Sequence, residues 1–502
     1  MSWMEQVLKR GRQRHAGRTA IIEGDRHITY SELDFRTDNL ASAFLAMGID
    51  RGDRIAVVSH NRTEVVETYF ALGKIGAAAV PIHYGAVSDE VAAVVKECGV
   101  TAIVGAAGLP GTENDRFGCP VLVYESQDYQ RAVSGGPGLA RRGTHDDELA
   151  FILHTSATTG RSKGVCLDQN ALRYGALGYL AEADVPSDAV LLHCGPLSHG
   201  AMIVPFIYLA AGATVVLMPM FTPAECVARI RGSKVTDLFL VPDMLRLVLN
   251  TEGLARAPLS TLREVIYGAA PMPRSLLLAA RSALNCGFRQ VYALTEAGAA
   301  VATLSPDDHD HAPEDAVGRA IMGTTVRSHD DRGDACPPGE IGELWVSSPA
   351  VMRGYWHDQE ATAEVIRGGW LRTGDLGSVD KNGYVRLAGR QKDVIVRGGQ
   401  KVFPAEVERV LRGHHAVRDA CVVGIPSEEW GELPFAYAVA SGDSGDPAEL
   451  VGGLRELARG QLATYKRPVG IEIVAELPRN AAGKVDRRRL RARVAGGGNA
   501  EH

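Results

Sequence analysis

Short apolar segments alternate with longer amphipathic segments through the first half of the chain. The stretch "DRIAVVSHN" at 53–61 predicts a buried strand, and "TEVVETYFALGKIGAAAVPI" at 63–82 predicts a helix that leads into the next strand. The alternation returns in five later segments: "VTAIVGA", "PVLVY", "ATVVLMP", "VTDLFLVP" and "LREVIYGAA". Strands that alternate with helices predict an α/β fold, with several layers around a mainly parallel sheet.

The pattern changes twice further along the chain. From about residue 320 it consists of short strands and turns, such as "DKNGYVRLAG", which predict a β-rich subdomain. After "GRQKD" at 389–393, the segments read as helix, strand, turn, strand and helix, which predicts a compact α+β domain. Because 502 residues exceed one ordinary domain, we expect a large N-terminal domain at 1–390 and a small, mobile C-terminal domain at 391–502.

Composition excludes several classes of protein. The net charge of −6, with both signs mixed along the chain, argues against a nucleic-acid binder. The basic run "RRRLRARV" near the end is interpreted as a solvated terminal helix. Eight cysteines without a CxxC pair suit a reduced compartment and neither a disulfide framework nor a zinc site. The N-terminus lacks the apolar core of a signal peptide, so we expect a cytoplasmic protein.

One uncharged stretch, residues 201–220, has the length of a membrane span. Pro205, Gly212 and Pro219 interrupt it, and helix breakers at these positions argue against a span. We expect a short buried helix followed by a strand.

The stretch "LHTSATTGRSKGV" at 153–165 has the composition of a phosphate-handling loop. It lies between the predicted strand "LAFILHT" and the predicted helix "LDQNALRYGALGYL". It does not fit GxxxxGK[ST], because Gly160 and Lys163 are not adjacent and no Ser or Thr follows the lysine. By itself the stretch is as compatible with a plain loop as with a binding function.

Four further motifs follow it in order: "YALTEAG" at 292–298, "LRTGDLG" at 371–377, "GRQKDVIVRGGQKVFPAEVE" at 389–408 and "PRNAAGKVDRRRL" at 478–490. Together the five motifs resemble the adenylate-forming superfamily of acyl- and aryl-CoA synthetases, peptide-synthetase adenylation domains and luciferase. The resemblance covers nearly the whole chain. It implies a carboxylic acid as substrate, with ATP, Mg²⁺ and CoA.

Adenylation chemistry accounts for the residue types of the first motif. Attack of a carboxylate on the α-phosphorus of ATP expels pyrophosphate, and the protein must hold the triphosphate and offset its charge. Hydroxyls, backbone N–H groups and a lysine do this without a covalent bond. The resemblance implies that the β- and γ-phosphates are cradled by Thr155, Ser156, Thr158, Thr159, Gly160 and Lys163. Ala157 and Ser162 stand where the family usually has glycine and proline, which predicts slower adenylation at most.

The second motif resembles the adenine and metal segment of the family. The resemblance implies that Tyr292 stacks on adenine, Thr295 contacts phosphate and Glu296 is the carboxylate associated with Mg²⁺. Ala293 replaces the usual glycine. An earlier strand end, "GAAPM" at 268–272, resembles the segment that borders both adenine and the acyl group, through Gly268, Ala269 and Ala270.

The third and fourth motifs resemble ribose and hinge segments. Asp375 is expected to accept hydrogen bonds from both ribose hydroxyls, and Arg390 to lie beside the ribose and phosphates. Lys392 occupies the hinge position of the family.

The resemblance also assigns residues of the C-terminal domain. Gly398 and Gly399 resemble the pair that lines the pantetheine tunnel, where a missing Cβ lets the thiol chain pass. Lys401 stands where many relatives have asparagine. Lys484 in the fifth motif resembles the lysine that reaches the α-phosphate and the carboxylate during adenylation.

The segment "PLSHGAM" at 196–202 resembles the helix start that borders the acyl pocket. Amino-acid-activating members commonly carry an aspartate there, whereas this chain has His199 beside apolar residues. A cationic substrate would find no counter-charge, so we expect an uncharged aryl, alkyl or terpenoid-like acid. His199, which a core role would also explain, is counted with Thr295, Glu296 and Lys484 as catalytic. The expected pocket residues are His199, Met202, Ile203, Ala269, Ala293 and Leu294.

The acidic, His-rich stretch "PDDHDHAPED" at 306–315 suggests a metal site at first sight. It has no regular ligand spacing and is bounded by prolines, so a solvated loop is the favoured interpretation.

The sequence therefore predicts an AMP-forming carboxylic acid–CoA ligase. Two alternatives stay open: an adenylating enzyme that loads an acyl carrier protein or another nucleophile, and a non-catalytic acyl-nucleotide binder. The retained motif residues argue against the second alternative.

Overall fold

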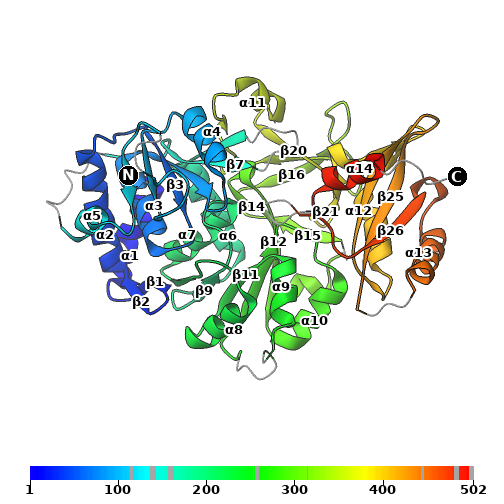
Figure 1. The fold of residues 1–502 in the computed structure, drawn as a ribbon, viewed down its shortest axis with the longest axis horizontal. Helices are drawn as coiled ribbons and strands as arrows, with labels where there is room; N and C mark the ends of the chain where they lie inside the picture. Colours follow the sequence, from blue (N-terminus) through cyan, green and yellow to red (C-terminus); the bar gives the residue numbers. More distant parts are fainter. Residues whose placement is uncertain are drawn as a thin grey trace. The chain divides into compact units, whose positions relative to one another are not determined.

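The computed structural model describes residues 1–113, 117–135, 143–155, 163–252, 254, 259–313, 315–442, 446–479 and 485–496. The chain forms two compact units (Figure 1). The first comprises residues 1–326 and 346–372, and the second comprises residues 327–345 and 373–502. The predicted domain boundary at residue 390 lies within the second unit and stays a prediction.

Two mainly parallel sheets form the frame of the first unit. Within this unit, the strands of the first follow the order β15-β14-β13-β12-β11-β9-β10-β1-β2, and those of the second follow the order β18-β8-β7-β4-β3-β5-β6. The strands of the first are β15 (Ala316–Ala320), β14 (Ala299–Leu304), β13 (Gly287–Leu294), β12 (Glu264–Gly268), β11 (Asp237–Leu240), β9 (Val190–His193), β10 (Thr214–Leu217), β1 (Thr19–Glu23) and β2 (Arg26–Thr29). Those of the second are β18 (Gly354–Tyr355), β8 (Lys163–Asp168), β7 (Leu149–Thr155), β4 (Ala78–His83), β3 (Arg54–Ser59), β5 (Ala102–Gly105) and β6 (Val121–Val123). The predicted α/β class is confirmed.

Helix α3 (Thr63–Ile75) lies between the two sheets. It contacts β1 of one sheet and β4 and β7 of the other, and all its residues are buried. A helix enclosed on all sides must pair its charges, since an unpaired buried charge is costly. Glu67 accepts a hydrogen bond of 2.7 Å from the Tyr129 hydroxyl, and Lys74 donates one of 2.7 Å to Asp34.

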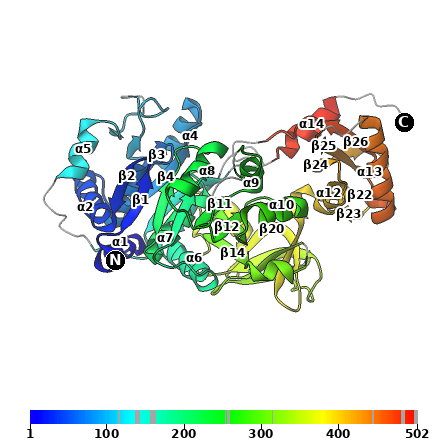
Figure 2. The same cartoon turned by 90° about the horizontal axis from the view of Figure 1, so that it is seen from below.

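Three helices cover the outer face of the first sheet: α8 (Pro223–Gly232), α9 (Pro242–Leu249) and α10 (Arg274–Leu284) (Figures 1 and 2). Their buried side chains form one apolar cluster with the strands beneath, for example Ile230 and Val248 with Leu238. Apolar burial of this kind is the main force that holds such layers together. The unit is therefore built of alternating helix and sheet layers.

The uncharged stretch at 201–220 folds as predicted. It forms the turn η1 (Gly200–Met202), the buried helix α7 (Ile203–Ala211) and strand β10. Gly212 ends the helix with φ 85°, a conformation that glycine adopts without strain. Among the described residues, no helix has both the length and the apolar content needed to cross a bilayer.

Short strands follow residue 316, as predicted. They are β16 (Thr325–His329), β17 (Gly342–Ser347), β18, β19 (Ile366–Arg367), β20 (Trp370–Val379) and β21 (Tyr384–Arg390). The remaining chain forms a sheet with the order β23-β22-β25-β24, in which β26 lies beside β25. Its strands are β22 (Ile395–Arg397), β23 (Gln400–Val402), β24 (Val417–Ser427), β25 (Gly431–Ala440) and β26 (Gly470–Val474). Helices α12 (Pro404–Arg412) and α13 (Pro447–Gln461) pack against it, which confirms the predicted α+β character.

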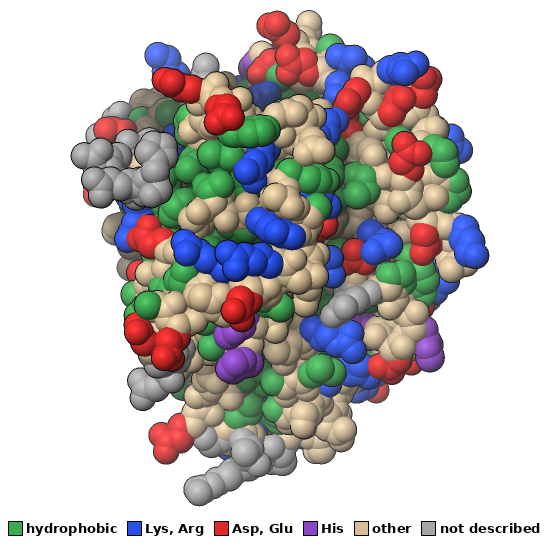
Figure 3. Space-filling view, turned by 90° about the vertical axis from the view of Figure 1, so that its right-hand side faces the viewer, with side chains coloured by type: hydrophobic (Ala, Val, Ile, Leu, Met, Phe, Trp, Pro, Cys, Tyr) green, Lys and Arg blue, Asp and Glu red, His purple; other side chains and the backbone are tan. Residues whose placement is uncertain are grey.

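The basic run forms the predicted terminal helix, α14 (Arg487–Gly496), in which Arg488, Arg489 and Arg493 are exposed, but one side of the helix is anchored to the sheet. Leu490 is buried against Cys421 and Val423 of β24. Arg487 forms an ion pair of 2.7 Å with the buried Glu408. Val494 packs against the same cluster. On the face that Figure 3 shows, Lys and Arg side chains form a short row among acidic and apolar ones.

Candidate functional site

The phosphate motif lies in a β-hairpin. Thr155 at the end of β7 pairs with Lys163 at the start of antiparallel β8. Helix α6 (Gln169–Glu182) begins later, where the Asp168 carboxylate accepts a hydrogen bond from the Ala171 N–H at 2.8 Å. The prediction that the loop after the first strand leads into a helix at Leu167 is therefore wrong, because strand β8 intervenes. Apolar side chains at 165–167 are buried in the second strand, which hides the end of the hairpin in the sequence pattern.

The tip of this hairpin is outside the described residues. It contains four expected phosphate contacts and two departures from the family: Ser156, Thr158, Thr159 and Gly160, with Ala157 and Ser162. Their roles stay predictions.

Tyr355, which the sequence analysis did not single out, lies between two motif residues. Its hydroxyl donates a hydrogen bond of 3.2 Å to Oε1 of Glu296. The Lys163 ammonium lies 4.8 Å from the centroid of the same ring, at the distance of a cation–π contact. Burial, followed by the neighbouring Glu296 carboxylate, raises the pKa of Tyr355. The phenol is therefore protonated at neutral pH and able to donate to Glu296.

The "YALTEAG" motif leaves β13 and forms the short turn η3 (Thr295–Ala297). Tyr292 is buried and Ala293 is exposed. Gly298 ends the turn with φ 74°, and a Cβ at this position would lie 2.0 Å from the Ala350 carbonyl oxygen. The turn that carries Glu296 therefore depends on the absence of a side chain at Gly298.

The "GAAPM" segment continues from the neighbouring strand β12. A Cβ on Gly268 would lie 2.3 Å from the Val291 carbonyl oxygen of β13, so this glycine permits close strand packing. Ala269 is exposed and has φ 66°, which costs a non-glycine residue about 1–2 kcal/mol. Strained backbone of this kind clusters at functional sites. Both strand ends thus reach the same carboxyl edge of the sheet.

The segment expected to border the acyl pocket, residues 196–204, has both buried and accessible side chains. Met202 and Ile203 are 0% and 2% exposed and face the core. His199, Ala201 and Val204 are partly exposed. The backbone of this turn also lies against the "LTEAG" turn.

Gly200 forms the contact between the two turns. A Cβ on Gly200 would lie 3.3 Å from the Thr295 hydroxyl oxygen. A helix does begin in this segment, and its accessible apolar side chains are those of Ala201 and Val204; its place beside the acyl pocket stays a prediction.

A row of rings extends from His199. The His83 ring lies 5.3 Å from the His199 ring, and the Tyr84 ring lies 4.2 Å from both His83 and His60. His83 and Tyr84 follow each other at the end of β4, and His60 follows the parallel strand β3. Burial, and then the nearby His60, lowers the pKa of His83. This places a neutral imidazole beside His199 at neutral pH.

In the second unit, Asp375 and Arg390 form an ion pair with each other, which the sequence did not predict. They lie opposite each other on β20 and β21, with Arg390 Nε 2.8 Å from Asp375 Oδ1. Lys392 is exposed on the short turn η5 (Gln391–Asp393).

The two predicted tunnel glycines form the turn between β22 and β23. Gly398 and Gly399 have φ 55° and 81°, in the region that favours glycine. A Cβ on Gly398 would lie 2.9 Å from the Trp430 ring. Lys401 pairs with Asp331 at 3.0 Å. Lys484 is outside the described residues.

The acidic, His-rich segment is tied to the fold by polar contacts. His309 lies 2.9 Å from the Tyr267 hydroxyl, Asp308 pairs with Arg319, and Asp310 pairs with Arg281. Across the ranges that the structure describes, no group of three or more His, Cys, Asp or Glu residues is arranged to hold a metal ion.

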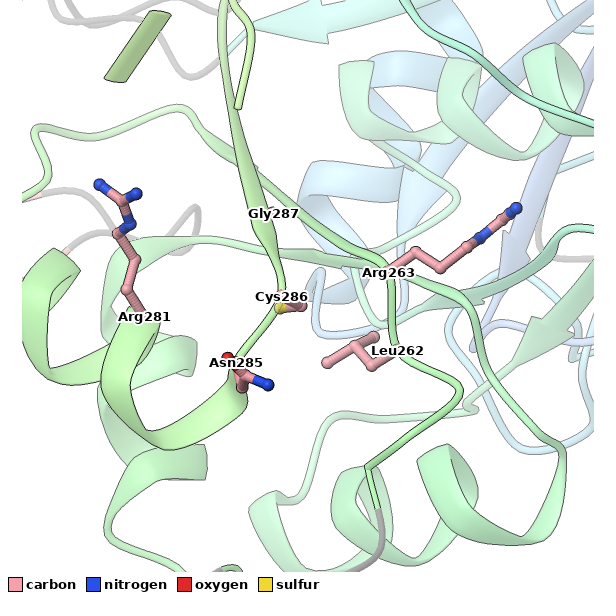
Figure 4. A pocket seen from close by; sticks show the side chains of 6 residues that line it. All are labelled: Leu262, Arg263, Arg281, Asn285, Cys286 and Gly287. Carbon is pink, nitrogen blue, oxygen red and sulfur yellow. The ribbon is translucent and has the colours of Figure 1, made fainter. Parts of the chain in front are cut away.

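An open depression lies at the beginning of β12 and β13 (Figure 4). Its lining consists of Leu262, Arg263, Arg281, Asn285, Cys286 and Gly287. Ligands of parallel sheets bind at the carboxyl ends of the strands, and this depression is at the amino ends. It is therefore distinct from the motif residues at the opposite edge.

The sequence matches the AMP-binding enzyme family over residues 8–356 and the AMP-binding enzyme C-terminal domain over residues 406–484. A feruloyl-CoA synthase from Amycolatopsis sp is 34% identical over 482 residues, which cover 95% of this chain and 96% of that protein. The fatty acid–[acyl-carrier-protein] ligase ScoC from Streptomyces coeruleorubidus is 32% identical, over 95% of this chain and 93% of that protein. The solved structure of amide bond synthetase McbA from Marinactinospora thermotolerans has a TM-score of 0.89 and 31% identity, and covers 97% of this chain and 99% of that one.

These similarities confirm the predicted superfamily, fold class and enzyme class, because acyl- and aryl-CoA ligases are among the relatives. CoA ligases of this family use ATP, Mg²⁺ and CoA, as the motifs predict. The chain belongs to the AMP-binding enzyme family, the adenylate-forming ligases.

Proposed function

We propose that this protein is an AMP-forming carboxylic acid–CoA ligase. The observation that carries the proposal is the arrangement around Tyr355, which contacts a phosphate-motif cation, Lys163, and a metal-motif carboxylate, Glu296. Adenylation needs an ammonium and a metal-binding carboxylate near one triphosphate, because the enzyme must neutralise the growing charge on the leaving pyrophosphate.

In the first half-reaction, a carboxylate oxygen of the acid attacks the α-phosphorus of ATP. The bond to the β-phosphate oxygen breaks, and pyrophosphate leaves in line. Thr155 and Lys163 hold the β- and γ-phosphates with the hairpin tip, and Thr295 contacts phosphate. Tyr292 stacks on adenine, and Asp375 accepts from the ribose hydroxyls beside Arg390. Lys484 approaches the α-phosphate.

Glu296 fits the role of a Mg²⁺ carboxylate. It is partly exposed, its Oε1 accepts from a neutral phenol, and it has no ion pair with a cationic side chain among the residues described. A carboxylate oxygen is a ligand that hard cations prefer. When bound, Mg²⁺ supplies charge neutralisation at the phosphates.

In the second half-reaction, the thiol of CoA attacks the acyl carbonyl and AMP leaves. Gly398 and Gly399 lack side chains, which supports their role beside the pantetheine chain. Lys392 is the proposed hinge, and the C-terminal domain is proposed to begin after residue 390.

The acid is proposed to be an uncharged aryl, alkyl or terpenoid-like acid. The partly exposed residues His199, Ala201 and Val204 support this, since they offer no carboxylate to a cationic substrate. Ala293, Leu294 and Ala269 complete the proposed pocket, and Met202 and Ile203 support it from the core.

Transfer to an acyl carrier protein is the second candidate. Three relatives that are 34%, 32% and 31% identical to this chain are named as a CoA synthase, a carrier-protein ligase and an amide bond synthetase. Proteins about equally similar to this chain therefore differ in the acceptor of the acyl group. The cytoplasm remains the proposed location, since it supplies ATP and CoA.

ATP–pyrophosphate exchange across a panel of aryl, alkyl and terpenoid acids tests the first half-reaction. We expect exchange that requires Mg²⁺ and at least one such acid, and that falls by orders of magnitude in Glu296→Gln. Product formation with CoA, with a phosphopantetheinylated carrier protein and with a simple amine then identifies the acceptor. A chain that binds ATP and acid without any exchange would be a binder, contrary to the proposal.

A further inference from the structure

Tyr355 belongs to none of the five motifs, yet it contacts two of them. Its hydroxyl binds Glu296 from the second motif, and its ring faces Lys163 from the first. These two contacts come from segments far apart in the sequence. Strand β18, which contains Tyr355, pairs with β8, and this pairing brings the ring to Lys163.

The backbone around Tyr355 is fixed on several sides. Tyr355 pairs with Val165 across the antiparallel strands, and its N–H donates to the Thr362 hydroxyl at 2.9 Å. The Trp356 N–H donates to the Gly164 carbonyl at 2.7 Å. A ring on such a backbone has a defined position relative to β8.

The same segment also holds the turn that carries Glu296. The Met352 N–H donates to the Glu296 carbonyl at 2.8 Å. Both the main chain and the side chain of Glu296 are therefore bound by residues 352–355, so Glu296 is positioned from outside its own motif.

The two contacts of Tyr355 differ in kind. Its hydroxyl occupies one carboxylate oxygen of Glu296, and its π face attracts the Lys163 ammonium. No ion pair joins Lys163 to Glu296 in the part of the chain that the structure describes, although both contact the same phenol. Direct pairing would neutralise both groups, whereas contact of each group with a neutral phenol leaves each charge available.

We propose that Tyr355 is a positioning residue for adenylation: its hydroxyl orients Glu296 toward a divalent cation, and its ring holds Lys163 toward the triphosphate. The phenol thereby keeps the carboxylate and the ammonium from pairing with each other. This inference rests on the proposed function, because it assigns the cation and the triphosphate to those two residues.

Two variants separate the hydroxyl from the ring. Tyr355→Phe removes only the hydroxyl, and we expect it to raise the Mg²⁺ concentration for half-maximal exchange about tenfold, the scale of one hydrogen bond to a charged group. The KM for the acid should change less than about twofold, because the ring remains in place. Tyr355→Leu should in addition weaken the binding of metal-free pyrophosphate about fivefold, because Lys163 loses the ring.

Trp356→Phe is the matched control. It removes the Trp356 Nε1 hydrogen bond to the Glu97 carbonyl on the same segment, but touches neither Glu296 nor Lys163. If Tyr355 acts only through folding, Trp356→Phe and Tyr355→Phe should lower the urea midpoint alike and leave the Mg²⁺ dependence unchanged. That pattern would overturn the proposal.

A double-mutant cycle gives the decisive readout. In a Glu296→Gln background, Tyr355→Phe should have no further effect on the Mg²⁺ dependence of ATP binding, measured by calorimetry without acid. If Tyr355→Phe weakened the Mg²⁺ dependence of ATP binding as much in the Glu296→Gln background as in the wild type, the hydroxyl would not act through Glu296. Calorimetry needs no turnover, so it tests Tyr355 even if wild-type protein exchanges with no acid, which would refute the proposed function separately.

Discussion

Arg390 Nε lies 2.8 Å from Oδ1 of Asp375, and the two residues face each other across β20 and β21. The Asp375 side chain is 7% exposed, whereas that of Arg390 is 45% exposed. A nearly buried carboxylate is stable only when charge and hydrogen bonds compensate its desolvation. Arg390 thus fixes the orientation of the carboxylate that we assign to the ribose.

Asp375→Asn should lower kcat/KM for ATP about 10- to 100-fold in the exchange reaction, since hydrogen bonds to a charged group contribute about 1.5–3 kcal/mol. The specific check compares ATP with 2′-deoxy-ATP. The wild type should prefer ATP, and the variant should lose most of that preference. Asp380→Asn, in the turn of the same hairpin, is the control. Asp375 has another role if the variant keeps the full preference for ATP.

Gly298→Ala should destabilise the first unit strongly. Gly298 has φ 74°, and its new Cβ would lie 2.0 Å from the Ala350 carbonyl oxygen. Gly24→Ala is a matched control, because Gly24 has φ 61° with open space around it. The control should lose about 1 kcal/mol from backbone strain, and Gly298→Ala about 3 kcal/mol or more in urea unfolding. Equal losses would mean that the carbonyl moves aside at little cost.

His193 makes the folded state sensitive to acid. It is fully buried at the end of β9 and stacks on Phe239 at 6.0 Å. Burial lowers the pKa of His193 to about 3, and the nearby Gly195 backbone opposes this only partly. The unfolded chain binds a proton near pH 6.5 and the folded chain does not, so stability from this group is present above that pH and is lost on acidification.

From pH 7 to pH 5 the wild type should lose about 2 kcal/mol of unfolding free energy through His193. His193→Leu should show a smaller loss over the same interval, measured by urea unfolding at each pH. His27→Asn, at an exposed position, should retain the wild-type slope. A slope in His193→Leu that equals the wild-type slope would place the acid sensitivity elsewhere.

Local patterns in the sequence predict the layers well, because the alternation of strand and helix depends on neighbouring residues. They fail at Lys163–Asp168, where three apolar residues suit the start of a helix as well as a short strand. They also fail to find Tyr355. Nothing in "GYW" indicates that β18 pairs with β8, which brings the ring to Lys163, or that Met352 binds the turn that carries Glu296.

The motif residues themselves could be predicted because their resemblance to a known superfamily spans the chain. Whether the side chain of each residue faces the core or the surface could not be predicted from the sequence. Met202 and Ile203 lie in the expected segment, but their side chains are buried in the core, whereas Ala201 and Val204 are accessible. That division depends on packing against other elements, which residue spacing does not record.

The last prediction separates the two half-reactions. Lys484 is expected to touch the reacting phosphate, and Gly398 and Gly399 to line the path of the thiol, although all three belong to the predicted C-terminal domain. The hypothesis is that this domain turns about Lys392 between the two steps. Lys484→Ala should therefore abolish acyl-adenylate formation, yet still convert supplied acyl-adenylate and CoA to the thioester.

Lys392→Pro should have the opposite effect, because proline fixes φ at the exposed turn η5. Adenylation, measured by exchange, should stay largely intact, and thioester formation should slow. Each variant is assayed for both steps, and circular dichroism verifies that it is folded. If both folded variants lose both half-reactions to the same extent, the rotation about Lys392 is wrong for this protein.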